Sequence, residues 1–173
     1  TTILVFEYVV GSITGSPDLD PDGIEVASLV DLNGGTILDN ATNTAILSFA
    51  PPTTTGIVIQ PAALQGVVVS DGTYAAGDPI LLTATFDSVV TVTGTPQIAM
   101  SLDGSGSTAS TVYATYASGS GSTTLVFNYT VDTGHLDTNG IAVNSPILLS
   151  GGTIQDAGLN DAILTFPLPT TTG

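Results

Sequence analysis

Three aspartates at alternate positions form the sharpest chemical motif of the sequence, Asp18 to Gly23, which reads DLDPDG. Side chains at alternate positions of a tight loop converge, and the closing glycine permits the turn, so this spacing matches the first half of a twelve-residue calcium loop. The twelfth position is Leu29 rather than glutamate, which leaves Glu25 as the candidate for a further carboxylate. The alternative is a solvated acidic turn. The expected calcium ligands are Asp18, Asp20, Asp22 and Glu25.

Weaker groups of oxygen ligands occur at other predicted loops. At one of them His135, Asp137 and Asn139 stand where the first motif has three aspartates, and the smaller negative charge should weaken calcium binding. For the remaining groups, calcium bridging at a junction between domains competes with a role of Asp and Asn as turn formers. These remaining weaker candidates are Asp71, Asp78, Asp156, Asn160 and Asp161.

The sequence predicts that the protein is not an enzyme. His135 is the single histidine and there is no cysteine, so a catalytic triad or a zinc site has no second member. The carboxylates of Asp18 and Asp20 are a pair of the kind that glycosidases use, but they lie on one local turn without a predicted cleft. No catalytic residue and no organic cofactor is therefore assigned.

Composition restricts the partners. The net charge is −15, with no lysine or arginine, so the chain repels nucleic acid and anionic membrane surfaces. No apolar run reaches the roughly 18 residues that span a bilayer, which argues against direct membrane insertion. The hydrophobic content of 42% is enough for a folded core. The sequence has no initiator Met and no signal peptide, and we expect a mature product or an excerpt.

An internal repeat sets the domain organisation. Residues 23–56 match residues 140–173 at a constant offset of 117, with 20 of 34 positions identical. The match extends backwards, because Leu4, Phe6 and Tyr8 correspond to residues 125, 127 and 129 at an offset of 121. We therefore predict the C-terminal half of one repeat over 1–51, a linker over 52–56, a complete repeat over 57–169, and a further linker over 170–173.

Alternation of apolar and polar residues predicts an all-β chain without long helices. Turn dipeptides and glycine clusters separate short segments with period 2. The predicted strands are 66–70, 79–86, 89–93, 96–102, 109–117, 123–131, 140–143, 147–149 and 161–166. The residues predicted to be buried are Ile80, Leu82, Phe86, Leu125, Phe127, Tyr129, Ile163 and Phe166. Short strands at this spacing indicate a Greek-key β-sandwich.

Several motifs of the complete repeat carry a resemblance to a known class: GTYAAGD, VTVTGTP, SGSG and GGTIQD. In combination they resemble the immunoglobulin-like or cadherin-like tandem repeats of large bacterial surface proteins. The resemblance implies an immunoglobulin-like sandwich in an extracellular, cell-surface setting, often with calcium at loops and junctions. The implied role is a structural repeat that builds a calcium-stabilised fibre or filament. The alternative is an adhesin module that binds a glycan or a host protein.

The incomplete half over residues 1–51 lacks the strands that correspond to residues 67–116. Its inward residues would then expose apolar surface to water; they are Leu4, Phe6, Tyr8, Ile46 and Phe49. Such a face costs several kcal/mol at roughly 25 cal/mol per Å². Either upstream residues or a neighbouring copy must cover it. We expect adjacent repeats or copies of the chain to be the partners, in a head-to-tail contact that produces a filament.

Overall fold

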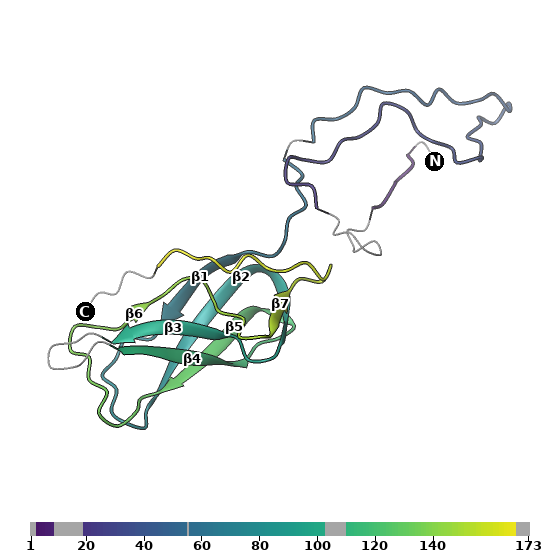
Figure 1. Ribbon diagram of the computed structural model, residues 1–173. Helices are drawn as coiled ribbons and strands as arrows, with labels where there is room; N and C mark the ends of the chain where they lie inside the picture. Colours follow the sequence, from purple (N-terminus) through teal and green to yellow (C-terminus); the bar gives the residue numbers. More distant parts are fainter. Residues whose placement is uncertain (1–2, 9–18, 55, 103–109, 169–173) are drawn as a thin grey trace. The chain divides into compact units, whose positions relative to one another are not determined.

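The computed structural model describes residues 3–8, 19–54, 56–102 and 110–168. The chain divides into two compact units, one made of Thr1–Pro17 with Pro61–Gly173 and the other of Asp18–Gln60. All the strands lie in the first unit, and the two units are described separately below (Figure 1). The strands are β1 Leu64–Val69, β2 Pro79–Thr93, β3 Gln97–Leu102, β4 Ser110–Ser118, β5 Ser122–Thr130, β6 Ala142–Val143 and β7 Thr153–Gln155.

The strands form one antiparallel sheet in the order β1-β2-β5-β4-β3-β6, and β7 pairs with β2 beside this path. The sheet curls strongly into a half-barrel (Figure 1). Strand β2 extends over 15 residues, and its register shifts between Thr85 and Val90. Before the shift β2 pairs with β1 and β5, and after it Thr91 to Thr93 pair with β7. The bend in β2 therefore joins the main sheet to the C-terminal hairpin.

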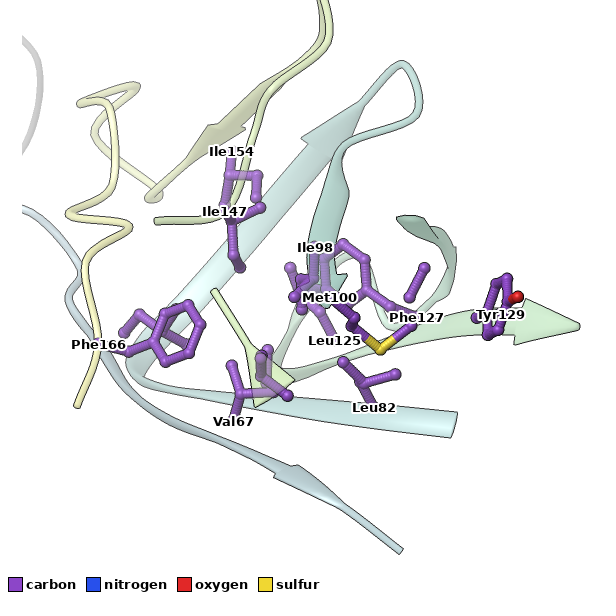
Figure 2. Close-up of a cluster of buried hydrophobic side chains, with 14 of the residues drawn as sticks. Val67, Leu82, Ile98, Met100, Leu125, Phe127, Tyr129, Ile147, Ile154 and Phe166 are labelled. Atoms are coloured by element: carbon purple, nitrogen blue, oxygen red, sulfur yellow. The ribbon is translucent and has the colours of Figure 1, made fainter. Parts of the chain in front are cut away.

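The core fills the concave side of the sheet. Leu82, Leu125 and Phe127 are fully buried, and the register places Leu82 directly opposite Phe127. Tyr116 packs its ring edge against Phe127, with centroids 6.0 Å apart at 73°, an arrangement that aromatic pairs prefer. Figure 2 shows Leu82, Leu125 and Phe127 in one buried cluster with Ile147 and Ile154 of the C-terminal hairpin. Period-2 alternation thus puts every second residue into one shared core.

The sequence predicted the all-β class, and the structure confirms it: no helix occurs in the described ranges. The predicted strands 79–86 and 89–93 are one strand, β2, because the bend does not interrupt the chain direction. Segments 147–149 and 161–166 form only isolated bridges rather than strands. Strand β7 was not predicted. Burial was wrong for Ile163, which is 46% exposed because only its backbone joins the sheet.

The second unit holds no strand in its described residues and is built from bridges between loops. Leu29 bridges Ser48, and Leu38 bridges Thr44, so residues 29–48 form a hairpin-like turn. At its base, the backbones of Asp20 and Ile59 exchange two hydrogen bonds of 2.7 and 2.9 Å. The unit is therefore held mainly by backbone contacts, with little buried apolar surface.

Candidate functional site

The predicted calcium loop is only partly within the described residues, because Asp18 lies outside them. The Oδ1 atom of Asp20 accepts the backbone N–H of Gly23 at 3.1 Å, which closes the turn. Desolvation raises the pKa of Asp20, and so do a hydrogen bond with Asp22 and the negative charge of Asp22. The carboxylates of Asp20 and Asp22 are thus close enough that their mutual repulsion disfavours ionisation of both. A bound divalent cation would offset that repulsion.

The third described member of this loop, Glu25, is exposed. Within the described ranges, no three carboxylate or histidine side chains gather closely enough to hold a metal ion. Among the described residues, the support for a calcium site therefore comes from Asp20 and Asp22. The four-residue site that also includes Asp18 and Glu25 stays a prediction.

Asp71 and Asp78 flank the loop that joins β1 to β2, and the structure places this loop beside the one that follows β5. The backbone N–H of Gly77 donates to Val131 at 2.8 Å, and that of Val131 donates to Asp78 at 3.0 Å. The Asp78 carboxylate accepts the N–H of Ala75 at 2.8 Å, so it fixes its own turn. Asp71 is exposed. These contacts favour a turn-forming role for Asp78 and bring two acidic loops to one end of the sheet.

The loop after β5 contains the weaker candidates Asp137 and Asn139. The Asp137 carboxylate accepts the backbone N–H of Asn139 at 3.1 Å, a local turn. Nearby, the Tyr129 hydroxyl lies 2.5 Å from His135 Nδ1, and the two rings stack. The Asp132 carboxylate is 4.0 Å from the same nitrogen. Desolvation raises the pKa of Tyr129. His135 therefore packs the loop against the end of β5, a contact that sequence patterns did not indicate.

Asp156 and Asn160 are joined in a tight turn after β7. Asp156 Oδ1 accepts the backbone N–H groups of Gly158 and Asn160, and Oδ2 accepts the Asn160 side-chain amide. Asp161 accepts the Gln155 amide at 2.9 Å. Both oxygens of Asp156 are thus engaged by protein donors, which favours the turn-forming role over a calcium-binding one.

The same turn is built twice in the molecule. Asp39 accepts the backbone N–H groups of Ala41 and Asn43 and the Asn43 side-chain amide, at 2.8 to 2.9 Å. The surrounding backbone repeats as well, since Ala45 donates to Ile37 at 2.9 Å, as Ala162 does to Ile154. The hairpin over residues 30–47 and the hairpin over 147–164 therefore share one local structure. The constant 117-residue offset was the sequence signal for this equivalence.

Apart from Asp87 at the bend of β2, the outward strand residues of the convex face carry no charged side chain. These residues alternate with the core and are Val68, Leu81, Thr83, Thr85, Gln97, Ala99, Ser101, Thr111, Tyr113, Thr115, Thr124, Val126 and Asn128. Asp87, which lies in β2, sits at the bend and accepts the Ala63 N–H at 2.8 Å. Tyr113 is the one exposed aromatic in residues 56–102 and 110–168. The other charged residues described within 56–102 and 110–168 lie in the turns and loops between the strands.

Comparison of the chain with protein-family models, with curated proteins and with solved structures finds no match. The described residues include no helix with the length and apolar character that a membrane span requires.

Proposed function

We propose that the chain is a structural, extracellular repeat, whose units associate head to tail into a calcium-stabilised fibre at a cell surface. The observation that carries this proposal is the duplicated hairpin, which has one local structure in two settings. In the complete unit Ile154 is 1% exposed and Phe166 7% exposed, whereas the equivalent Phe49 is 41% exposed. A copy with an uncovered apolar face is what a unit in an assembly presents before its neighbour is in place.

The finer fold in this proposal is an immunoglobulin-like Greek-key sandwich for residues 57–169. Support comes from the seven strands of the described residues, the curled antiparallel sheet and the C-terminal hairpin that packs across its concave side. The hairpin residues Ile147 and Ile154 are buried with Val90 and Phe166 in the same core. Closing the concave side in this way supports a two-layer arrangement.

Calcium has a defined task in this proposal. It would be held by Asp18, Asp20, Asp22 and Glu25, and it would neutralise carboxylates for which the chain has no lysine or arginine. The raised pKa of Asp20 supports this assignment, because desolvation first, and then the hydrogen bond and the negative charge of Asp22, disfavour the ionised form, and the chain has no lysine or arginine to offset them. Binding at the loop would rigidify the second unit, which has few apolar contacts of its own.

The alternative, a module that binds a glycan, has weaker support. Modules that recognise glycans usually present exposed aromatic rings, but Tyr113 is alone on the convex face. The ring of Tyr74 is half-buried, and its hydroxyl donates to the Ser70 carbonyl at 2.8 Å. The structural role therefore remains the better proposal.

Electron microscopy of the purified chain, with 2 mM calcium or with excess chelator, tests the structural role. We expect filaments with a regular axial repeat in calcium, and their shortening or loss in chelator. A strictly monomeric sample under both conditions at high micromolar concentration, together with specific binding on a glycan array, would favour the alternative instead.

A further inference from the structure

Two asparagines of the sequence, Asn33 and Asn139, are each followed directly by glycine. In such a pair the glycine nitrogen can attack the side-chain amide carbon of the asparagine, because glycine has no Cβ to shield that nitrogen. The bond from nitrogen to Cγ forms, the bond from Cγ to the amide nitrogen breaks, and the proton of the attacking nitrogen leaves with the amide group as ammonia. Water then opens the succinimide ring at either carbonyl and gives aspartate or isoaspartate. The reaction needs no enzyme and no reactant other than water.

Asn33 and Gly34 are the two central residues of a tight turn. Their φ values are 43° and 79°, and the Gly35 N–H donates to the Leu32 carbonyl at 2.7 Å. Positive φ at both central residues defines a type I′ turn, for which Asn–Gly is a preferred pair. One backbone hydrogen bond closes the turn, so little must open before the Gly34 nitrogen can rotate onto Cγ of Asn33.

The reacting groups of this pair are accessible. Asn33 and Gly34 are both exposed to water. Among the described residues, no acceptor receives the Gly34 N–H, and no protein group bonds the side-chain amide of Asn33. A Cβ built on Gly34 would meet no atom within 4 Å beyond its two chain neighbours. Ring closure therefore meets neither a competing hydrogen bond nor a steric block.

The other copy of the repeat builds the same turn with a different first residue. Ser150 and Gly151 have φ values of 49° and 83°, and the Gly152 N–H donates to the Leu149 carbonyl at 2.8 Å. Serine stands here, at the 117-residue offset of the repeat, where the first copy has Asn33. This turn has no side-chain amide to lose, so it is a natural control for the chemistry of Asn33.

The turn at Ser150 is also fixed by its surroundings. A Cβ on Gly152 would lie 2.2 Å from the Thr93 carbonyl, and a Cβ on Gly94 would lie 2.8 Å from the Gly152 Cα atom. The turn therefore lies tightly against the end of β2. The Ser150 hydroxyl adds a hydrogen bond of 3.1 Å to the side-chain carbonyl of Gln97.

The turn at Asn33, by contrast, is held from within its own loop in the described structure. A Cβ on Gly35 would meet the Leu32 carbonyl at 3.1 Å and no other described atom within 4 Å. The Asn33 N–H donates to Asp31 Oδ1 at 2.9 Å, which is a further bond inside the loop. Local opening should therefore cost less here than at the packed turn, and ring closure requires that opening.

We propose that Asn33 is a self-modification site, at which the chain converts its own asparagine to aspartate and isoaspartate through a succinimide. Isoaspartate carries the backbone through the former side chain, which inserts a methylene between residues 33 and 34. The Leu32 carbonyl and the Gly35 N–H can then no longer close a type I′ turn, so the arm of the hairpin over residues 30–37 loses its register with residues 45–47. The proposal goes beyond the fibre and does not depend on it, because a single chain reacts with water.

The test measures deamidation of the full chain, carrying Ser150→Asn, by mass spectrometry of peptic peptides. The chain is aged at mildly alkaline pH, either folded or unfolded in guanidinium chloride, because the unfolded chain gives the intrinsic rate of each Asn–Gly pair. Deamidation adds about 1 Da, and electron-transfer fragmentation distinguishes isoaspartate from aspartate. In the folded chain Asn33 should react within about tenfold of its unfolded rate, whereas the asparagine introduced by Ser150→Asn should be slowed about 100-fold or more.

A second measurement follows the hairpin itself. The amides of Val30 and Ala45 donate to Leu47 and Ile37 at 3.1 and 2.9 Å, across the two arms. Their hydrogen exchange should become about tenfold faster or more in the aged natural chain. Asn33→Ser, which copies the turn of the other copy and cannot form the succinimide, should show no such change after the same ageing. Freshly prepared Asn33→Asp supplies the added charge without the methylene, and it should keep the turn, because Asp–Gly also favours type I′.

Three results would overturn the proposal. The peptide with Asn33 could keep its mass while the peptide with Asn139 gains mass, which would exclude the modification. Asn33 could be protected as strongly as the asparagine of Ser150→Asn, which would show that its turn is not the more open one. Deamidation could also leave exchange at Val30 and Ala45 unchanged, which would contradict the loss of register. Exchange in residues 80–86 of β2 checks that the complete unit stays folded in every variant.

Discussion

Asp156 accepts both the backbone N–H and the side-chain amide of Asn160, each at 3.0 Å, so one carboxylate holds the whole turn after β7. The same relationship joins Asp39 and Asn43 in the other copy. Leu159 and Thr42, at equivalent positions in these turns, both have positive φ values, of 62° and 66°. The turn therefore forms from its own side chains, whether or not a sheet lies beneath it.

The Asp39 turn should be sensitive to acid. The Asn43 side-chain amide, followed by its backbone N–H, lowers the pKa of Asp39. Because the folded-state pKa lies below the unfolded one, this stabilisation is present above about pH 3.9 and is lost as the pH falls through the folded value. Carboxyl carbon chemical shifts in an NMR titration would measure it. Asn43→Ala should raise the pKa of Asp39, and Asn160→Ala, in the other copy, should leave it unchanged.

Equivalent phenylalanines should differ sharply in their contribution to stability. Phe127→Ala removes a fully buried ring and should lower the free energy of unfolding by about 3–5 kcal/mol. Phe6→Ala removes a ring that is 72% exposed and should change it by less than about 0.5 kcal/mol. Urea unfolding followed by circular dichroism measures both. Equal losses would mean that residues 3–8 are covered in solution.

Substitution of the two equivalent glycines, Gly152 and Gly35, should also cost different amounts of stability, with the larger cost at Gly152. Gly152→Ala forces a Cβ against the Thr93 carbonyl and should cost about 1–3 kcal/mol, because the contact is with backbone that must shift. Gly35→Ala meets only the loop carbonyl of Leu32 and should cost much less. Thermal unfolding of the two variants, recorded side by side, gives the comparison. A tolerated Gly152→Ala would contradict the close approach of the hairpin to β2.

Calcium should reverse the titration behaviour of Asp20. Without a cation, the pKa of Asp20 is higher in the folded chain than in the unfolded chain. Its contribution to folding stability is therefore fully present below the unfolded-state pKa and is lost as the pH rises through the folded-state pKa. A bound cation favours the ionised form and should bring the pKa below its ordinary range. Carboxyl shifts of Asp20 with and without 2 mM calcium would show the change.

Asp20→Asn provides the matched variant for the calcium prediction. In chelator it should relieve the repulsion with Asp22 and leave the second unit as stable or slightly more stable. In calcium it should remove the gain that the natural chain shows, because a carboxylate ligand is lost. Identical melting curves for the natural chain in calcium and in chelator would contradict the predicted site.

Sequence patterns predicted the β class and most of the core, because alternation over β2 and β5 is long and both strands are central. Leu82 and Phe127, for example, are buried opposite each other as the pattern requires. Alternation could not reveal that Ile163 joins the sheet through its backbone alone, nor that β2 runs through its bend as one strand. These features depend on the path of the chain rather than on local periodicity.

Site prediction succeeded less well, for a physical reason. Spacing identifies carboxylates that can converge, but it does not show which hydrogen-bond donors already occupy them. Asp78 and Asp156 each accept backbone N–H groups of their own turns. The contact of Tyr129 with His135 is likewise a result of how the loop folds back, and no residue pattern marks it.

The placement of charge at the loops and at the bend of β2 affects how closely two copies of the curled sheet can approach each other. Strand β5 has nine residues, so at about 3.3 Å per residue the middle of the convex face lies roughly 15 Å from either end. The Debye length is about 30 Å at 0.01 M salt and about 8 Å at 0.15 M. At low salt the carboxylates therefore repel a neighbour in every orientation. At physiological ionic strength the threonine-rich middle of the face lies almost two Debye lengths from these carboxylates. As salt increases, the electrostatic repulsion between two convex faces should therefore disappear before the repulsion between the ends of two sheets does.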